Sequence, residues 1–153
     1  VWREPSKAVG DPGTPEGNTA IIERLTEEFW NQKSISVLEE THSADFIAHN
    51  PAVRGNPFDF ESYKRICLAY MAAFPDLGAV NAEVIAEGDK VVTRWIATGT
   101  HLGKFGDAPP TGRPVRFEGI TIYRVADGRI VEEWWSYNLL GLLQQLGVAP
   151  SMW

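Results

Sequence analysis

The stretch VRFEGITIYRVADGRIVEEWWSY, residues 115–137, decides the fold. On both sides of its centre, apolar residues alternate with polar ones, a period typical of β-strands that bury one face. The three central residues, ADG at 126–128, have the composition of a tight turn. The stretch therefore predicts an antiparallel hairpin made of two long strands.

The residues just before this hairpin predict a second one. Residues 79–88, AVNAEVIAEG, and residues 90–103, KVVTRWIATGTHLG, show the same alternation. The turn EGD between them has a glycine at the position that needs a positive φ. A long polar loop, GKFGDAPPTGRP, separates the two hairpins. Gly99 and Gly119 lie inside predicted strands, where glycines favour bends, so we expect a curved sheet.

Helical spacing of the apolar residues replaces this alternation on either side of the strands. The clearest case has apolar residues at i, i+3, i+4, i+7, i+8 and i+11 from Tyr63, and Pro75 ends it. Asn18 or Thr19 is expected to cap the first helix, and Ser34 the second. Helices are thus predicted at residues 18–34, 34–43, 63–74 and 139–147, and a short strand at residues 45–51.

The order of these elements predicts the class of fold. Helices come first, an antiparallel meander follows, and a helix ends the chain, which indicates an α+β fold with helices on one face of a curved antiparallel sheet. The 153 residues fit a single domain with one core. We expect that domain at residues 18–149, after a flexible arm rich in proline and glycine at residues 1–17 and before a tail at residues 150–153.

The composition excludes several classes of partner. The chain is 44% hydrophobic and 22% charged, which is ordinary for a globular protein. Its net charge of −6, with Lys and Arg scattered singly, argues against nucleic-acid binding. No apolar run approaches the roughly 18–20 residues that a membrane span needs. No signal-like segment is seen either, and the expected location is cytoplasmic.

The cysteine and histidine content argues against a metal site. Cys67 is the only cysteine, so neither an intramolecular disulfide nor a thiolate metal site can form, and we interpret it as a small buried hydrophobic residue. No two of His42, His49 and His101 have the spacing that places metal ligands on one face. His42 is expected at the surface.

Five fragments of the chain resemble the SnoaL-like polyketide (ester) cyclases, which are NTF2-like proteins. In chain order they are FIAHNP, AAFPDL, VIAEGDKVVTRWIATGTHLGKF, PPTGRPVRFEGITIYRVADGRIVEEW and LGLLQQLG. The likeness runs from about Ile21 to Gly147. The resemblance implies a cone-shaped α+β barrel with an apolar pocket between helices and sheet, a homodimer, and no cofactor. It also implies ring closure by intramolecular aldol condensation, with one acidic side chain as acid and base.

The sequence departs from the family at one position. The family commonly has an aspartate between the tryptophan of the last strand and the final helix. Here this segment is WWSYN, residues 134–138, and Asn138 aligns with the aspartate. An amide takes no proton at neutral pH, although its NH₂ group can hold a carbonyl or enolate oxygen. Either the base lies elsewhere, or the aldol activity does not carry over.

Four further residues are candidates for acid/base chemistry, which needs a base near an acidic C–H and a donor for the enolate oxygen. His49 ends the short strand and is either a base or donor at the pocket mouth or a structural histidine. The same two interpretations apply to His101, at the end of a long strand. Glu118 is mid-strand, and is either solvated or directed into the cavity with a raised pKa. Asp76 is either a turn residue or a base.

Adjacent residues on a strand face opposite sides, which restricts two further pairs. One of Glu132 and Glu133 points inward on a regular strand, and a bulge would invert the pair. Arg94 and Trp95 also face opposite ways, so Arg94 is either outward or an inward donor for a carboxylate or enolate oxygen. The remaining substrate-binding candidates are aromatic or hydroxyl side chains: Trp95, Trp134, Tyr137, Ser136, Phe74 and Tyr70.

Three functional hypotheses follow. The first is a cofactor-free enzyme that cyclises or enolises a hydrophobic carbonyl compound, with a base among His49, Glu118 and Asp76. In this hypothesis Asn138, together with Tyr137 or His101, holds the enolate oxygen. The second is a non-catalytic NTF2-like domain that binds a small apolar ligand or a partner. The third keeps the fold for epoxide hydrolysis or ketosteroid-type isomerisation. A buried acid or histidine in the largest pocket favours an enzyme, whereas an entirely apolar cavity favours a binding domain.

Overall fold

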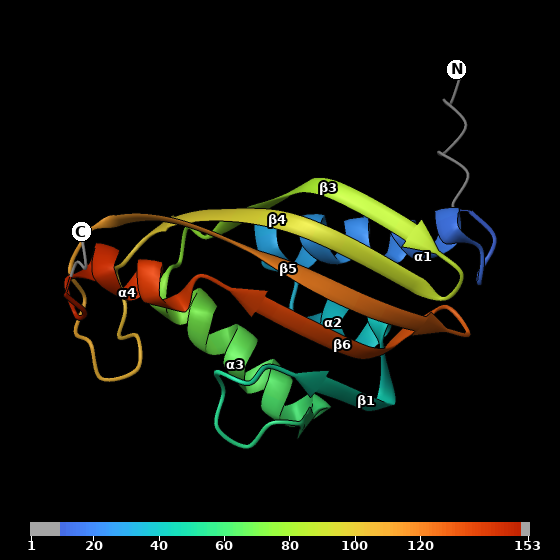
Figure 1. Cartoon of the computed structure of the whole chain (residues 1–153), viewed down its shortest axis with the longest axis horizontal. Helices are drawn as coiled ribbons and strands as arrows, with labels where there is room; N and C mark the ends of the chain where they lie inside the picture. The colour runs from blue at the N-terminus through green and yellow to red at the C-terminus, as the bar shows by residue number, and fades with distance from the viewer. Residues whose placement is uncertain (1–9, 151–153) are drawn as a thin grey trace.

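The computed structural model describes residues 10–150 and shows a curved sheet with helices on its concave side (Figure 1). The α+β class is therefore confirmed. In chain order the elements are α1 (Pro15–Arg24), the π-helix η1 (Leu25–Asn31), α2 (Ser36–Thr41), β1 (His42–His49), β2 (Phe58–Asp59), α3 (Phe60–Ala73), β3 (Gly78–Glu87), β4 (Lys90–Thr100), β5 (Pro114–Ala126), β6 (Arg129–Tyr137) and α4 (Leu139–Leu146).

The six strands form one open sheet in the order β2-β1-β6-β5-β4-β3. Strands β3 to β6 are the predicted antiparallel meander. In contrast to the predicted antiparallel sheet, β1 pairs with β6 in parallel. The two strands are separated in the chain by β2, α3 and the rest of the meander, so no tight turn between them imposes an antiparallel orientation. The sheet does not close into a barrel, since β2 and β3 remain at its two edges.

The two predicted hairpins are present, with left-handed residues at their turns. Gly88 in EGD has φ +57°, and in ADG both Asp127 (φ +52°) and Gly128 (φ +72°) have positive φ. Two successive residues of positive φ match the twist of the flanking strands, and Ala126 pairs with Arg129 next to the turn. Beyond the pair of Val125 and Ile130, a register shift of the bulge kind pairs Arg124 with Glu132 and Tyr123 with Glu133. That register decides which β6 side chains face the helices.

The first helix begins earlier than the sequence pattern predicts. Thr14, not Asn18 or Thr19, is its N-cap, and the Thr14 Oγ1 accepts a hydrogen bond from the Gly17 backbone N at 3.1 Å. Pro15 occupies the first helical position, where its missing N–H is not needed. Residues 15–17 of the predicted arm therefore form the first turn of α1, and residues 1–9 lie outside the described residues. Likewise, α2 starts at Ser36 without a side-chain cap from Ser34.

Helix α3 agrees with the predicted stripe. Asp59 caps it by accepting a hydrogen bond from the Ser62 backbone N at 2.9 Å, and the helix ends just before Pro75. Tyr63 and Cys67 on the stripe are buried against the core. Helix α3 therefore presents one face toward the concave side of the sheet.

His42, expected at the surface, is instead 2% exposed. Its ring packs on Phe46, Phe60 and Tyr63, with centroids 4.7, 5.7 and 5.3 Å away. The ring nitrogen Nδ1 lies 3.0 Å from the Leu38 carbonyl oxygen, to which it can donate as a neutral imidazole. Burial lowers the pKa of His42 to about 4, only partly offset by that hydrogen bond. Because its sequence neighbours, Thr41 and Ser43, are polar, the sequence does not predict that His42 is buried among aromatic rings.

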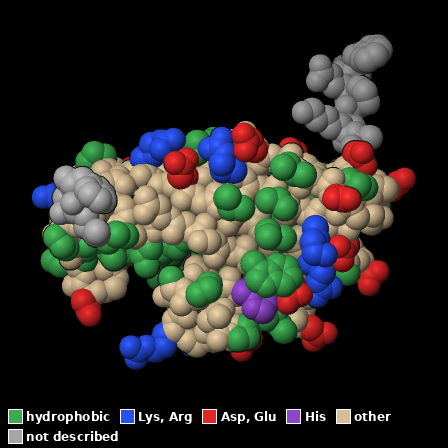
Figure 2. Space-filling view, in the orientation of Figure 1, with side chains coloured by type: hydrophobic (Ala, Val, Ile, Leu, Met, Phe, Trp, Pro, Cys, Tyr) green, Lys and Arg blue, Asp and Glu red, His purple; other side chains and the backbone are tan. Residues whose placement is uncertain are grey.

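Within residues 10–150 no helix covers the convex face of the sheet (Figure 1), which holds several exposed aliphatic side chains. Register places Ile85, Val92, Ile122 and Trp134 in one row across β3, β4, β5 and β6. Figure 2 shows hydrophobic side chains on this face, with charged side chains around them. In the part of the chain that the structure describes, no helix is both long and apolar enough to cross a membrane.

We expect acid to destabilise the protein through His42. The unfolded chain protonates this histidine near pH 6.5, whereas the folded chain does so only near pH 4, so stability is lost as pH falls through that window. The loss assignable to His42 is about 2 kcal/mol between pH 7 and pH 5. Chemical denaturation of the wild type and His42→Phe at both pH values measures it, because phenylalanine fits the aromatic surroundings and does not titrate. A difference between the two proteins that stays constant with pH would contradict this assignment.

Candidate functional site

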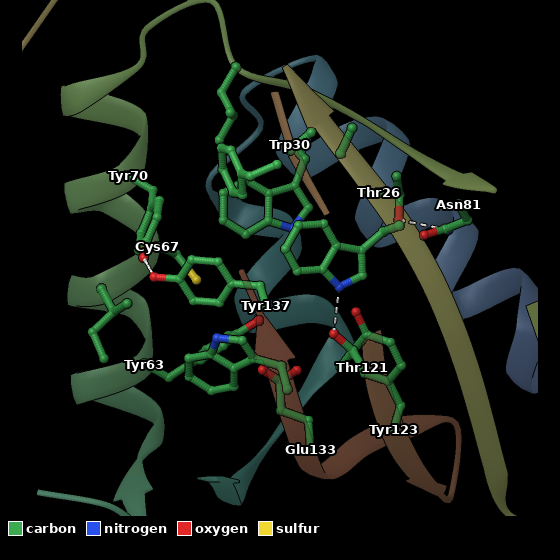
Figure 3. A pocket seen from close by; sticks show the side chains of 17 residues that line it. Thr26, Trp30, Tyr63, Cys67, Tyr70, Asn81, Thr121, Tyr123, Glu133 and Tyr137 are labelled. Atoms are coloured by element: carbon green, nitrogen blue, oxygen red, sulfur yellow. Dashed lines mark hydrogen bonds between the residues drawn. The ribbon is translucent and has the colours of Figure 1, made fainter. Parts of the chain in front are cut away.

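A cavity of about 770 Å³, mouth included, lies between the concave face of the sheet and the helices (Figure 3). Eight of its seventeen lining residues are aromatic. The lining consists of Thr26, Trp30, Tyr63, Ile66, Cys67, Tyr70, Leu77, Ala79, Asn81, Trp95, Ala97, Phe117, Thr121, Tyr123, Glu133, Trp135 and Tyr137.

The cavity exists because the helices meet the sheet mainly at its edges. Helices α1 and η1 contact the edge strand β3, and α3 contacts β1 and β2 at the other edge. Helix α4 contacts β5 and α2 contacts β6, but inward side chains of both central strands still line the cavity. On β6 these are Glu133, Trp135 and Tyr137, each two residues after the last.

A glycine on β5 makes room for the indole ring of Trp95, which lies on the neighbouring strand β4. A Cβ atom at Gly119 would lie 2.5 Å from the Cζ2 atom of Trp95, so only glycine fits beneath this indole. The Trp95 Nε1–H donates to the Thr121 Oγ1 at 2.9 Å, which orients the ring along the cavity wall. Gly119 thus serves close packing as well as the predicted bend.

Glu133 is the one carboxylate among the described residues that line the cavity, and none of them is Lys, Arg or His. The residue is 2% exposed, and its Oε2 has no hydrogen-bond partner among the described residues. Burial raises the pKa of Glu133 to about 8, a rise that the Tyr63 hydroxyl beside it partly offsets. A carboxyl group with such a pKa can exchange a proton near neutrality in either direction.

Two tyrosine side chains flank the Glu133 side chain (Figure 3), and the hydroxyl of one of them, Tyr63, lies beside the carboxyl group. Figure 3 shows Glu133 between Tyr63 of α3 and Tyr123 of β5. Burial raises the pKa of Tyr63 and of Tyr123 well above the ordinary value, and the charge of Glu133 adds to both rises. Both hydroxyls therefore stay protonated at neutral pH and can donate hydrogen bonds. Cys67, which also lines the cavity, has its pKa raised by burial, so its thiol is not nucleophilic there.

A second tyrosine pair crosses the cavity away from Glu133. The hydroxyls of Tyr70 on α3 and Tyr137 on β6 hydrogen-bond to each other. The Tyr137 ring also lies 6.2 Å from Trp95 and 5.9 Å from Phe117, measured between centroids. These contacts join the helical wall to the sheet wall.

The structure brings three of the predicted substrate-binding residues into the cavity: Tyr70, Trp95 and Tyr137. Phe74 lies in the adjoining core instead, fully buried against Phe105 and His101. The other predicted residues do not line the cavity.

Three predicted residues lie on the convex face, on the far side of the sheet from the cavity. His49 stacks on Trp134 with centroids 5.0 Å apart, and its Nε2 lies 2.9 Å from a carboxylate oxygen of Glu132. Arg124 donates to the same carboxylate at 2.8 Å. Ser136 is exposed one step further along β6. Glu132 is therefore the outward member of the glutamate pair, and Glu133 the inward one.

Glu118 and Arg94 are also convex-face residues. They lie across neighbouring strands as an exposed ion pair with 3.6 Å between nitrogen and oxygen, and Arg94 donates to Glu83 at 3.1 Å. The interpretation of Glu118 as a solvated residue is the one that the structure supports. Strand alternation places it on this face together with Ile120.

The last two base candidates have structural partners outside the cavity. Asp76 accepts hydrogen bonds from the backbone N and the hydroxyl of Thr100, both at 2.7 Å, and these bonds lower its pKa. His101 is fully buried next to Phe74, and its Nδ1 accepts a hydrogen bond from the Thr111 backbone N at 3.2 Å. Their hydrogen bonds to Thr100 and Thr111 hold the two ends of the loop after β4 in place.

Asn138, expected in the cavity lining, is the N-cap of α4. Its Oδ1 accepts a hydrogen bond from the Gly141 backbone N at 2.9 Å. The strand ends at Tyr137 and the helix begins at Leu139, so position 138 must satisfy a helix N-terminus. Asparagine is one of the best residues for that role, which explains an amide at this position.

The described residues contain no group of three or more His, Cys, Asp or Glu that could hold a metal ion. The site that the structure offers is therefore the aromatic cavity with Glu133. Sequence reasoning restricted the inward acid to one of two adjacent glutamates, and the strand register resolves the pair.

Comparisons with known proteins agree with this architecture. The family model for SnoaL-like polyketide cyclases matches residues 20–146. Among solved structures, AclR of Streptomyces galilaeus, a proposed hydroxylase, is 28% identical with a TM-score of 0.82, covering 90% of this chain and 89% of that one. IdmH of Streptomyces antibioticus, a proposed polyketide cyclase, is 36% identical with a TM-score of 0.76, covering 86% and 99%.

A proposed SnoaL-like polyketide cyclase from Jannaschia sp. CCS1 is 25% identical with a TM-score of 0.80, covering 98% of this chain and all of that one, 100%. A search of the curated proteins finds no significant match. Because the family model spans residues 20–146 and the similar structures match 86–98% of this chain, the chain belongs to the SnoaL-like polyketide cyclase family.

Proposed function

We propose that the protein is a cofactor-free enzyme that enolises or cyclises a hydrophobic carbonyl compound by acid/base chemistry. The observation that carries this proposal is the single carboxyl group of Glu133, buried in the wall of an aromatic cavity. The family and the description of IdmH as a proposed polyketide cyclase support it further. The presence of one buried acid in the cavity favours an enzyme over a domain that only binds an apolar ligand.

In this mechanism Glu133 replaces His49, Glu118 and Asp76 as the base. The ionised carboxylate takes a proton from the carbon next to the substrate carbonyl, and the C–H electrons form an enolate. The hydroxyl of Tyr63 or Tyr123 donates to the enolate oxygen, in place of Asn138. Such a donor is typically worth about 10²–10³ in rate.

Ring closure then uses the same groups in the reverse sense. The enolate carbon attacks a second carbonyl carbon of the same molecule, a C–C bond forms, and the resulting alkoxide takes the proton back from Glu133. The proton is thereby returned and no cofactor enters the balance. The rings of Trp30, Trp95 and Trp135 would hold a flat substrate and exclude water, conditions that also raise the pKa of the carboxyl group.

The alternative of epoxide hydrolysis receives less support. That chemistry requires two carboxylates around an activated water, with an arginine nearby. Among the described lining residues there is one carboxylate and no arginine. Arg94, the arginine considered for this role, pairs with Glu83 and Glu118 on the opposite face.

We expect Glu133→Gln to lower enolisation at least about a hundredfold, since a general base is typically worth 10²–10⁴. The measurement is exchange of the α-protons of 2-tetralone, a flat aromatic ketone, in D₂O by NMR. Glu132→Gln, the matched control on the convex face, should stay within about threefold of the wild type. The wild-type rate should rise about tenfold per pH unit up to pH 8 and then level, because only the ionised carboxylate acts. No wild-type exchange above buffer, or equal losses in both variants, would contradict the proposal.

The same substitution should stabilise the protein in base. The folded chain holds a proton on Glu133 up to about pH 8, whereas the unfolded chain releases it near pH 4.5. This contribution is thus present at low pH and is lost as pH rises through 8, by about 1.4 kcal/mol per pH unit between the two values. The unfolding free energy of Glu133→Gln relative to wild type should therefore increase from pH 5 to pH 8, whereas that of Glu132→Gln should show no such trend. A flat difference for Glu133→Gln would mean that Glu133 is not buried.

Asn138→Asp tests the placement of the aligned family position. An aspartate can cap α4 as well as asparagine, so we expect folding to be retained and 2-tetralone exchange to stay within about threefold of wild type. A change greater than about tenfold would place position 138 in the cavity and revive its role at the enolate oxygen. Thermal denaturation of the same sample checks the helix cap.

A further inference from the structure

The cavity combines one unpartnered carboxyl group with many aromatic faces. Rings come from every wall: Trp30 from η1, Tyr63 from α3, Trp95 from β4, Tyr123 from β5 and Trp135 from β6. Glu133 is one of the lining residues, and its Oε2 atom is buried without a hydrogen-bond partner among the described residues. A cationic ligand group next to Glu133 would compensate the charge of this carboxyl group when it is ionised.

The aromatic ring faces and the carboxylate that line this cavity all carry negative charge or partial negative charge. The face of an aromatic ring carries partial negative charge, and an ionised carboxylate carries a full one. None of the described lining residues is a lysine, arginine or histidine that would neutralise them. The nearest arginines of the central strands, Arg94 and Arg124, pair with acids on the convex face. The complementary group is a cation that is weakly hydrated and of low charge density.

We infer that the cavity binds an organic cation, an ammonium group carried on an aromatic or apolar scaffold, with the charge against Glu133 and the scaffold among the surrounding rings. A quaternary or tertiary ammonium group suits this site because aromatic faces attract it and little hydration is lost. Such a ligand would be an amine-bearing substrate or an inhibitor. The inference needs the cavity and the ionised carboxylate, and it does not depend on the proposed proton transfer.

Binding of a cation is coupled to release of a proton from Glu133. The other titratable groups that line the cavity are Tyr63, Cys67 and Tyr70 of α3, Tyr123 of β5 and Tyr137 of β6. Burial raises the pKa of all five, so they stay neutral below pH 9. The described lining residues of η1, β3 and β4 include no titratable group. Glu133 is therefore the group whose ionisation governs the pH dependence of binding between pH 6 and 9.

The test compares two ligands of the same shape, phenyltrimethylammonium and its neutral isostere tert-butylbenzene. Both are titrated into the full chain, and quenching of tryptophan fluorescence reports binding because Trp30, Trp95 and Trp135 line the cavity. At pH 9 we expect the cation to bind at least tenfold more tightly than the isostere. Its Kd should fall about tenfold per pH unit from pH 6 to pH 8 and then level, while the Kd of tert-butylbenzene stays constant.

Variants separate the charge from the shape of the site. Glu133→Gln should weaken phenyltrimethylammonium at least tenfold and leave tert-butylbenzene within threefold, which also shows that the cavity is intact. Glu132→Gln should change neither. The inference is overturned if the cation binds no more tightly than the isostere at pH 9, or if Glu133→Gln weakens both ligands equally. Because no turnover is measured, cation binding without 2-tetralone exchange would reject the proposed enzyme and keep this site.

Discussion

The central constraint on this molecule is that its helices contact the sheet mainly near its two edges and leave part of its middle uncovered. Helices α1 and η1 pack against β3, and α3 packs against β1 and β2. Helices α4 and α2 also contact β5 and β6, yet inward side chains of both strands still line an open space. Large inward side chains must then cover the distance, and aromatic rings supply the most area for each position. The same arrangement leaves a space that they do not fill, and this space is the site.

The chemistry of the site follows from placing one acid in that space. In water a glutamate is ionised at neutral pH, but burial among aromatic rings favours the neutral form. The carboxyl group can then serve a neutral ligand as a proton donor or acceptor, or a cationic ligand as a counterion. Tyr63 and Tyr123 remain hydrogen-bond donors in both situations, because burial keeps their hydroxyls protonated. One residue thus connects the folding energetics of the domain to both kinds of ligand.

Much of the architecture could be predicted from the sequence, since local patterns determine it. Alternation identified the four long strands, and the turns at Gly88 and Gly128 joined them correctly. The parallel pairing of β1 and the burial of His42 could not be predicted, because both depend on contacts between distant segments. Asn138 was expected in the cavity for a related reason. Alignment with a family position does not show that the side chain caps the following helix by accepting a hydrogen bond from the Gly141 backbone N. The sequence restricted the inward-facing acid to Glu132 or Glu133, and only the pairing of β6 with β5 shows that it is Glu133.

The sequence of β6 explains why that choice was difficult. Along EEWW, sliding the strand by one position would exchange Glu133 for Glu132 and Trp135 for Trp134, so the cavity would still receive one acid and one indole. The two alignments differ mainly at the next pair, where Ser136 would take the place of Tyr137 and the hydroxyl contact with Tyr70 would be lost. A register shift between Arg124 and Val125 already displaces β6 by one position relative to β5 near the turn, and the EEWW segment presents one acid and one indole to the cavity in either alignment. Such a strand can tolerate small changes of length in the β5–β6 turn while keeping a carboxyl group inside.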